Sequence, residues 1–223
     1  MAPALATTNP RLAQFKSRAA GDAQACAIDI TRRGAPLGRL VTALPPLPEA
    51  DLASLSQWRN AHRTAFFSER LSTPASTAAW LASIAQREDR ILFLIAGPAG
   101  ATVGHIGLNH VDEAAGRAES DAWLGIGDAR APGLMLAAFA TLLDWAFGTL
   151  GLQAVDAQVF SDNAKVLRAH EMLGFRLLEV VPFRRSDSGP EASWEPGDGA
   201  VRRPVSRLQL ARTDFEPRAA GWR

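Results

Sequence analysis

Hydrophobic residues in the first half of the chain predict two helices and a strand hairpin. Residues 49–60 carry apolar side chains at intervals of three, which is typical of one helix face. A second helix is expected to begin at Pro74, because a proline in the first turn follows the capping hydroxyl of Thr73. The apolar run 91–96 ends at a Gly-Pro-Ala-Gly turn, so residues 101–109 are expected to pair with it.

The second half predicts strands that alternate with helices. Residues 117–127 predict a third strand of the sheet, and an almost wholly apolar helix follows over 133–148. A strand at 154–160 leads into a helix that Asn163 caps and Gly174 ends. The final strands are expected at 175–181 and 205–211.

The predicted elements form a single domain. With a short strand at 38–44 in front, their order is β-α-α-β-β-β-α-β-α-β-β, which predicts a mixed α/β (α+β) sheet with helices on both faces. We place this domain at residues 38–212. Residues 1–37 are expected to be a mobile leader, 213–223 a disordered tail, and 184–204 a long polar loop inside the domain.

The composition narrows the class of protein. Lys and Arg total 24 against 23 Asp and Glu, and a net charge of +1 lacks the excess of basic residues that is typical of nucleic-acid-binding proteins. The single cysteine, Cys26, excludes an internal disulfide and a multi-cysteine metal site. The sequence lacks a signal-peptide pattern and an uninterrupted apolar stretch of membrane-spanning length, so we expect a cytoplasmic protein without membrane contact. Tyrosine is absent.

The turn from the third strand into the apolar helix is the clearest candidate site. Gly133 stands at the start of that helix, and no acidic residue lies in its first turn. The N–H groups and the positive dipole end of a helix N-terminus favour an anion, which a glycine allows to approach closely. Alone, this pattern is also typical of an ordinary structural turn. No Gly-x-Ser-x-Gly, His-Glu-x-x-His or Gly-x-x-x-x-Gly-Lys motif is present.

Four spaced segments within residues 39–211 together resemble the GCN5-related N-acetyltransferase (GNAT) superfamily. Arg130 and Gly133 fall on the family's acyl-CoA pyrophosphate loop. Asn163, with the ending Leu-Gly-Phe at 173–175, is similar to the family's second cofactor segment. The opening helices of its ribosomal-protein and amino-sugar acetyltransferases are matched by Trp58-Arg59-Asn60 and Trp80-Leu81.

This resemblance implies an acyl-CoA N-acyltransferase-like fold with a mostly antiparallel central sheet, and acetyl-CoA as cosubstrate. In the family, the strand before the pyrophosphate loop splays from its neighbour, and its backbone N–H polarises the thioester carbonyl. The expected cofactor-binding residues are Leu124, Gly125, Ile126, Arg130, Gly133, Leu134, Met135, Leu136 and Asn163.

The chain departs from the family pattern at three positions. Met135 stands where glycine or alanine is usual, Pro132 has no N–H to donate, and His170 replaces the tyrosine that protonates the leaving thiolate. A histidine can donate a proton near neutral pH, although a surface histidine could instead interact with the helix C-terminal dipole. Because His170 shares a face with Val166 and Leu173, we expect it to point inward.

Acetyl transfer also needs a base that removes a proton from the amine. Glu119 and Asp121 alternate onto one side of a strand and are the candidate catalytic carboxylates, unless they are simply solvated. His105 is either a further base or a structural histidine. The candidate substrate-binding residues are Arg59, Asn60, His105 and Trp194, with helix capping as the alternative for the first two and loop anchoring for Trp194.

The expected function is acetyl-CoA-dependent N-acetylation of a primary amine of a small molecule, such as an amino sugar or its nucleotide. Acetylation of a protein N-terminus and a non-catalytic acyl-CoA-binding module are the alternatives. We expect a monomer or homodimer with no nucleic acid, membrane or metal among its partners.

Overall fold

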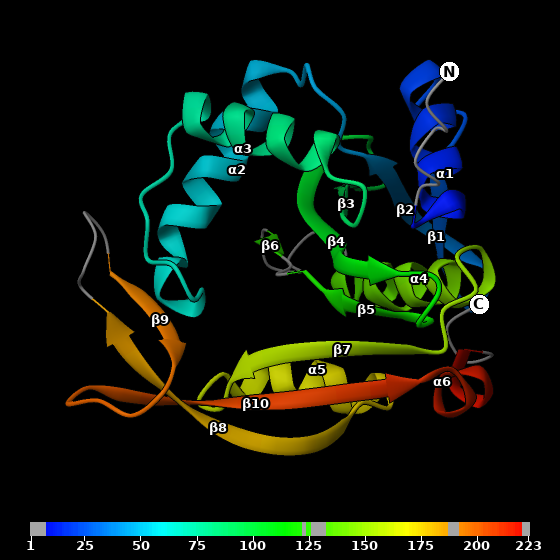
Figure 1. Cartoon of the computed structure of the whole chain (residues 1–223). Coiled ribbons are helices and arrows are strands. Elements are labelled where there is room, and N and C mark those ends of the chain that lie inside the picture. The colour runs from blue at the N-terminus through cyan, green and yellow to red at the C-terminus, as the bar shows by residue number, and fades with distance from the viewer. Residues whose placement is uncertain (1–7, 122–123, 126–132, 187–191, 220–223) are drawn as a thin grey trace, which may run out of the picture.

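One mixed sheet with helices on both faces makes up the fold in the computed structural model, which describes residues 8–121, 124–125, 133–186 and 192–219 (Figure 1). The strands are β1 (Ile28–Arg32), β2 (Ala35–Thr42), β3 (Ile91–Ala96), β4 (Thr102–Asp112), β5 (Arg117–Ser120), β6 (Leu124–Gly125), β7 (Ala154–Phe160), β8 (Arg176–Ser186), β9 (Ser193–Pro196) and β10 (Arg202–Ala211). The helices are α1 (Pro10–Gly21), α2 (Glu49–Ala61), the short 3₁₀ helix η1 (Arg63–Ala65), α3 (Pro74–Gln86), α4 (Leu134–Gly148), α5 (Ala164–Leu173) and α6 (Arg212–Ala219).

The strands are ordered β1-β2-β3-β4-β5-β7-β10-β8-β9, and β6 pairs with β4 beside this path. The pairs are antiparallel except for β5 and β7, which run parallel. The predicted hairpin of β3 and β4 is confirmed. The two final predicted strands, β8 and β10, also pair with each other, although β9 lies between them in the chain. The predicted mixed, mostly antiparallel sheet is therefore confirmed.

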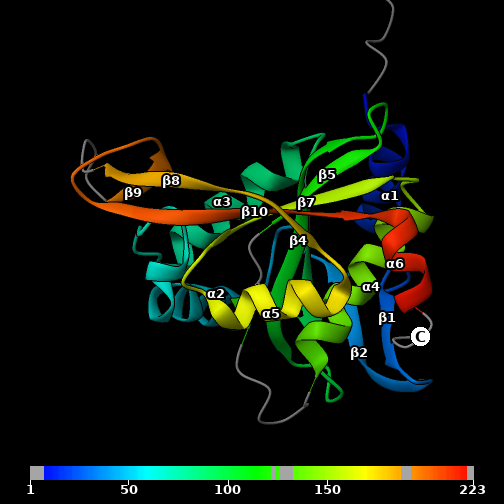
Figure 2. The ribbon, with the colours of Figure 1, turned by 90° about the horizontal axis from the view of Figure 1, so that it is seen from below.

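Helices cover both faces of the central strands. Alternate side chains of a strand point to opposite faces, and β3 is apolar on both. Ile91, Phe93 and Ile95 join the core formed with α4, whereas Leu92 and Leu94 join a second core formed with α2 and α3. Figure 2 shows β4 between α2 and α3 on one side and α4 on the other.

The expected mobile leader is wrong for residues 8–37. Instead, this segment contains α1, β1 and the start of β2, so the sheet begins ten residues before the predicted domain. Leu12 and Ile30 are completely buried in the main core. Their partners lie far along the chain, which is why the weak local periodicity of residues 1–37 gave no sign of them.

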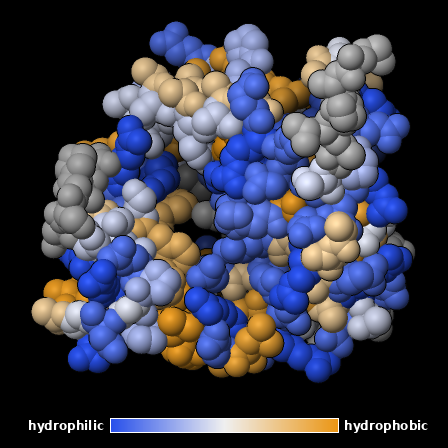
Figure 3. Space-filling model, viewed as in Figure 1, coloured by the Kyte–Doolittle hydropathy of each residue, from blue (hydrophilic) through white to orange (hydrophobic). Residues whose placement is uncertain are grey.

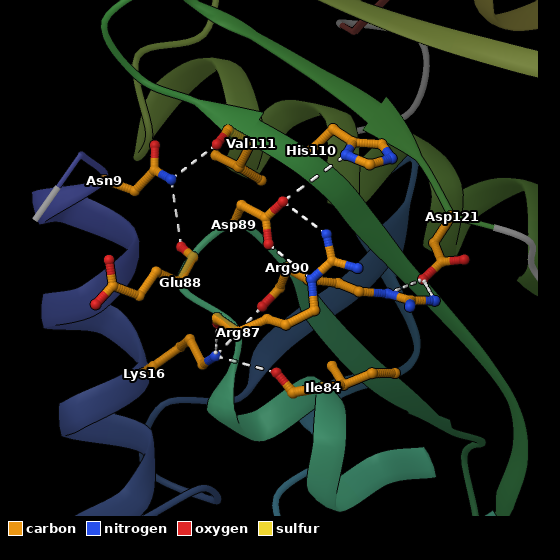
Figure 4. Close-up of polar contacts among 10 residues, drawn as sticks. All are labelled: Asn9, Lys16, Ile84, Arg87, Glu88, Asp89, Arg90, His110, Val111 and Asp121. Atoms are coloured by element: carbon orange, nitrogen blue, oxygen red, sulfur yellow. Dashed lines mark hydrogen bonds and ion pairs between the residues drawn. The ribbon is translucent and has the colours of Figure 1, made fainter.

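Two polar side chains fix this segment to the sheet and to α3 (Figure 4). Asn9 Nδ2 donates a hydrogen bond to the carbonyl of Val111 at 2.7 Å. Lys16 Nζ donates to the carbonyl of Arg87 at 2.6 Å, just after the end of α3. Burial lowers the pKa of the Lys16 ammonium, while Asp89 and Glu88 act in the opposite direction.

Three other expectations are corrected. Residues 184–204 are not one long loop, because β8 continues to Ser186, β9 follows and β10 begins at Arg202. One of the cross-strand pairs of β8 and β9 is charged, with a 2.6 Å hydrogen bond from Arg184 to Glu195, and no apolar alternation marks these short strands. The tail forms α6, and Phe215 packs in the main core. The strand expected at 117–127 is described as two pieces, β5 and β6.

Candidate active site

The sheet opens beside β6. β5 pairs in parallel with β7 only as far as Glu119 and Asp156. Further along, β6 pairs with β4, with Gly125 opposite Gly104 and Leu124 opposite His105, and among the described residues it makes no pairing with β7. The far edge of β6 therefore faces a gap, and Figure 3 shows the surface hollowed between α2 and the strands β7 and β10. Such an edge leaves backbone polar groups for a ligand.

The N-terminus of α4 lies at the end of the same chain segment. Gly133 is its N-cap and has a φ of 83°, a left-handed conformation that glycine adopts without strain. The first turn, all of which is described, contains no acidic residue. Its first N–H groups and the helix dipole suit a phosphate. The residues present thus fit a CoA diphosphate at α4 and a thioester carbonyl at β6.

The side chain of Met135 does not face this site. Met135 and Leu134 are buried in the main core, and Leu136 is half-buried against it. A ligand at the first turn of α4 therefore meets its backbone. The Met135 side chain, which stands where the family has glycine or alanine, does not crowd the phosphates. Ile126, Arg130 and Pro132 lie outside the described residues.

Asn163 acts as the predicted N-cap of α5. Its Oδ1 accepts a hydrogen bond from the N–H of Val166 at 3.3 Å, and Gly174 ends the helix in the left-handed conformation, with a φ of 101°. Both boundaries are confirmed. The structure thus gives the Asn163 side chain a capping contact, and contact with the cofactor stays a prediction.

His170 lies inside the protein, between α5 and α4. Only 2% of the residue is exposed, and its ring packs against Phe139 and Phe175 with centroid distances of 5.1 and 4.7 Å. Nδ1 lies 2.8 Å from the carbonyl of Val166, so Nδ1 carries the hydrogen and the neutral ring presents a lone pair at Nε2. Among the described residues, the buried Nε2 has no hydrogen-bond partner. Burial lowers the pKa of His170, and the bond to Val166 opposes this.

The two candidate carboxylates differ in their surroundings. Asp121 makes a tight ion pair with Arg90, whose Nη2 and Nε lie 2.5 and 2.8 Å from Oδ2 (Figure 4). Glu119 lies where β5 leaves β7 and accepts a hydrogen bond from Gln158 Nε2 at 3.2 Å. Burial raises the pKa of the Glu119 carboxyl, against the effect of this hydrogen bond. Glu119 is the carboxylate better suited to accept a proton.

His105 lies on β4 opposite Leu124, next to the open edge of the sheet. It is buried, and its ring lies 5.8 Å from that of Trp80. Burial lowers the pKa of His105 to about 4, with Arg90 and Arg59 acting in the same direction and Asp121 against it. Its buried Nδ1 lacks a hydrogen-bond partner within the described part of the chain. The ring of His105 is therefore neutral at pH 7, and its Nδ1 is the nitrogen without a hydrogen bond to the described residues.

The connection between α2 and α3 is fastened to β9, and we call residues 63–69 the strap. The N–H of Trp194 donates to the carbonyl of Phe67 at 2.6 Å, and Trp194 Nε1 donates to Glu69 at 3.0 Å. Arg59 donates to the carbonyl of Ser68, at the same strap. Trp194 is therefore a strand residue that holds the strap, in line with the anchoring alternative, and its expected role in substrate binding stays a prediction. Sequence reasoning missed Phe67 and Glu69, although the pair Phe66-Phe67 in a connection was a visible signal.

Asn60 has a structural contact of its own. Its Nδ2 donates to the carbonyl of Ser72 at 2.8 Å, and its Oδ1 accepts from the N–H of Ser72 at 2.7 Å. These two hydrogen bonds join the end of α2 to Ser72, just before α3 begins. Its expected role in substrate binding stays a prediction.

Two features are absent from the described part of the chain. The described residues contain no group of three or more His, Cys, Asp or Glu side chains placed to hold a metal ion. Within the same residues, no helix has both the length and the apolar character needed to cross a membrane.

A mostly antiparallel sheet that opens beside a helix N-terminus defines an acyl-CoA N-acyltransferase-like fold. The family model for the acetyltransferase (GNAT) domain matches residues 42–176, which is more than half of the chain. The chain therefore belongs to the GNAT acetyltransferase family, whose cosubstrate is acetyl-CoA. A search of curated proteins found no match.

Solved structures share this fold at low sequence identity. A GCN5-related N-acetyltransferase from Brucella melitensis is 19% identical, with a TM-score of 0.64 over 82% of this chain and 79% of that one. Vibrio cholerae spermidine N-acetyltransferase, solved with CoA and spermine, is 16% identical, with a TM-score of 0.61 over 76% and 94%. Mycobacterium smegmatis RimJ, solved with CoA-disulfide, is 19% identical, with a TM-score of 0.64 over 87% and 90%.

Proposed function

We propose that this protein transfers an acetyl group from acetyl-CoA to a primary amine of a small molecule, such as an amino sugar or its nucleotide. The observation that carries the proposal is the opening of the sheet at β6 beside the N-terminus of α4. In this arrangement a thioester and a diphosphate can be bound by backbone groups of one continuous segment. The resemblance to ribosomal-protein and amino-sugar acetyltransferases indicates the subgroup.

Acetyl-CoA supplies the acetyl group as a thioester. The backbone at Leu124 and Gly125 polarises the thioester carbonyl from the open edge of β6. Glu119 accepts the proton of the attacking amine, directly or through a water molecule. Among the described residues its carboxylate is bound by the amide of Gln158 and not by an arginine. Asp121 holds Arg90 in place instead.

His170 is proposed to deliver a proton to the departing thiolate. Its Nδ1 hydrogen is already donated to Val166, so proton exchange takes place at Nε2. The neutral ring has no hydrogen at Nε2, and His170 must therefore be protonated there before it can act as an acid. This requirement ties the proposed role to pH.

The strap favours a small molecule as the acetyl acceptor. We infer that the strap, held to β9 by the hydrogen bonds of Trp194 with Phe67 and Glu69, walls the outer side of the hollow. A folded protein must present an extended N-terminus to reach the gap past this wall. Acetylation of a protein N-terminus is the second candidate, because Trp58-Arg59-Asn60 also resembles the opening helix of the ribosomal-protein acetyltransferases.

The test combines ligand binding with an acceptor panel. Acetyl-CoA at millimolar concentration is expected to raise the melting temperature, because a ligand that binds only the folded state stabilises it. Release of CoA thiol is then measured with nucleotide amino sugars, polyamines, amino acids and short peptides. We expect turnover with a small amine. Turnover with peptides alone would favour the second candidate, and binding without any turnover would indicate a non-catalytic acyl-CoA-binding module.

A further inference from the structure

An arginine from the N-terminal hairpin lies against the start of α4. Arg32 is the last residue of β1, and a Cβ atom added to Gly133 would lie 2.5 Å from Arg32 Nη1 and 3.5 Å from its Cζ. The guanidinium therefore occupies the space beside the N-cap that a side chain at position 133 would fill. About a hundred residues separate the two in sequence, and no motif connects them.

The hairpin fixes the position of the Arg32 backbone. Arg32 pairs with Ala35 across a two-residue turn in which Arg33 and Gly34 have φ angles of 52° and 78°. Positive φ at both turn residues is the tight turn that matches the strand twist. Both β1 and β2 also pack against α4 (Figure 2). The backbone that carries Arg32 is thus anchored to the helix that the guanidinium meets.

The charges at this point favour one kind of ligand. A guanidinium is a permanent cation, and a helix N-terminus carries a positive partial charge. The fully described first turn of α4 adds no carboxylate. Two positive groups side by side both gain from an anion, and the planar guanidinium pairs well with phosphate oxygens. Arg32 is exposed, so an incoming ligand can reach it.

We propose that Arg32 binds the diphosphate of CoA together with the backbone N–H groups at the start of α4. This inference rests on the proposed function, since it takes acetyl-CoA as the cosubstrate. It gives the N-terminal hairpin, which precedes the residues matched by the family model, a direct part in cofactor binding. It also gives Gly133 a second role, which is to leave room for the guanidinium.

The test measures CoA affinity by calorimetry, without turnover. Arg32→Gln is expected to weaken CoA binding about tenfold, which corresponds to the loss of one charge-assisted hydrogen bond. Arg32→Lys keeps the charge but loses the planar guanidinium. Its CoA affinity is expected to lie between those of the original protein and Arg32→Gln. Arg33→Gln is the matched control in the same hairpin, and its affinity should equal that of the original protein. Melting curves without ligand check that each variant is folded.

Two truncated ligands identify the phosphate involved. Dephospho-CoA keeps the diphosphate, so Arg32→Gln should weaken its binding by the same factor. Acetylpantetheine has no diphosphate, and its binding should not change. Equal CoA affinity in a folded Arg32→Gln variant, or a loss that vanishes with dephospho-CoA, would overturn the proposal. If the unaltered protein does not bind CoA at all, it is the proposed function that fails.

Discussion

The four candidate titratable side chains differ in what surrounds them. Asp121 is bound to Arg90. Within the described part of the chain, the Glu119 carboxylate accepts its side-chain hydrogen bond from Gln158, and each of the two buried histidines keeps one ring nitrogen without a partner. A group can exchange protons during a reaction only if its partner does not hold it in one charge state. Glu119 and His170 therefore carry the proposed proton transfers.

The pH dependence of the rate tests this pair. Glu119 must be ionised to act as a base, and its pKa is raised from 4.5. His170 must be protonated to act as an acid, and its pKa is lowered from 6.5. The kcat of the saturated enzyme is therefore expected to rise through the pKa of Glu119 and to fall as the pH increases through that of His170, below pH 6.5.

Variants separate the two limbs of that profile. Glu119→Gln should lower kcat about a hundredfold and His170→Phe by a similar factor, the usual range for general acid–base groups. Glu179→Gln is the control and should leave kcat unchanged, because Glu179 is a surface carboxylate of β8 that pairs with Arg207 of β10. If kcat of the original protein stays level above pH 6.5, or if His170→Phe retains full activity, His170 is a packing residue and not the acid.

At the scale of elements, local sequence decided most boundaries. Thr73 and Ser76 exchange hydrogen bonds in a capping box at the start of α3, and Asn163 caps α5. These contacts join residues only three apart, so their spacing is visible in the sequence. The pairing of β8 with β9 is the opposite case, since it depends on partners that approach only in the folded chain.

Asn163→Ala separates capping from cofactor binding. Loss of the cap leaves the N–H of Val166 without its acceptor, and we expect the free energy of unfolding to fall by about 1 kcal/mol. Thr73→Ala removes the cap of α3 and should cost a similar amount without changing CoA affinity. Urea denaturation and CoA titration of both variants are the measurements. A weaker CoA affinity in Asn163→Ala alone would show that this side chain also contacts the cofactor.

At the scale of the whole molecule, buried histidines make stability depend on pH. His105 binds a proton at about pH 4 in the folded chain, against a reference value of 6.5. Between these values the unfolded chain binds more protons, so the free energy of unfolding falls as the pH decreases from 6.5 to 4. The full shift corresponds to about 3 kcal/mol. The stability contribution is complete above pH 6.5.

Urea unfolding at a series of pH values checks this expectation. His105→Leu should flatten the decrease between pH 6.5 and 4, because the apolar side chain takes up no proton. His62→Leu, at an exposed position, should retain the decrease of the original protein. If the variant at position 105 keeps the whole decrease in the free energy of unfolding, another group causes that decrease. His170 is then the next residue to change.

The sequence by itself determined the central part of this protein. Apolar periodicity and capping residues predicted α2 to α5 and most strands between them, because helix and strand signals lie within a few residues of one another. The same local patterns led to the family, to Gly133 at the head of α4 and to an inward-facing His170.

Only the tertiary structure decided how distant segments meet. Asn9 and Val111 are 102 positions apart, and Arg32 and Gly133 about as far, so no local pattern records either contact. The burial that raises the pKa of Glu119 and lowers that of His105 likewise comes from elements packed around them. Such contacts form when the sheet assembles, and the chemistry of the site depends on them.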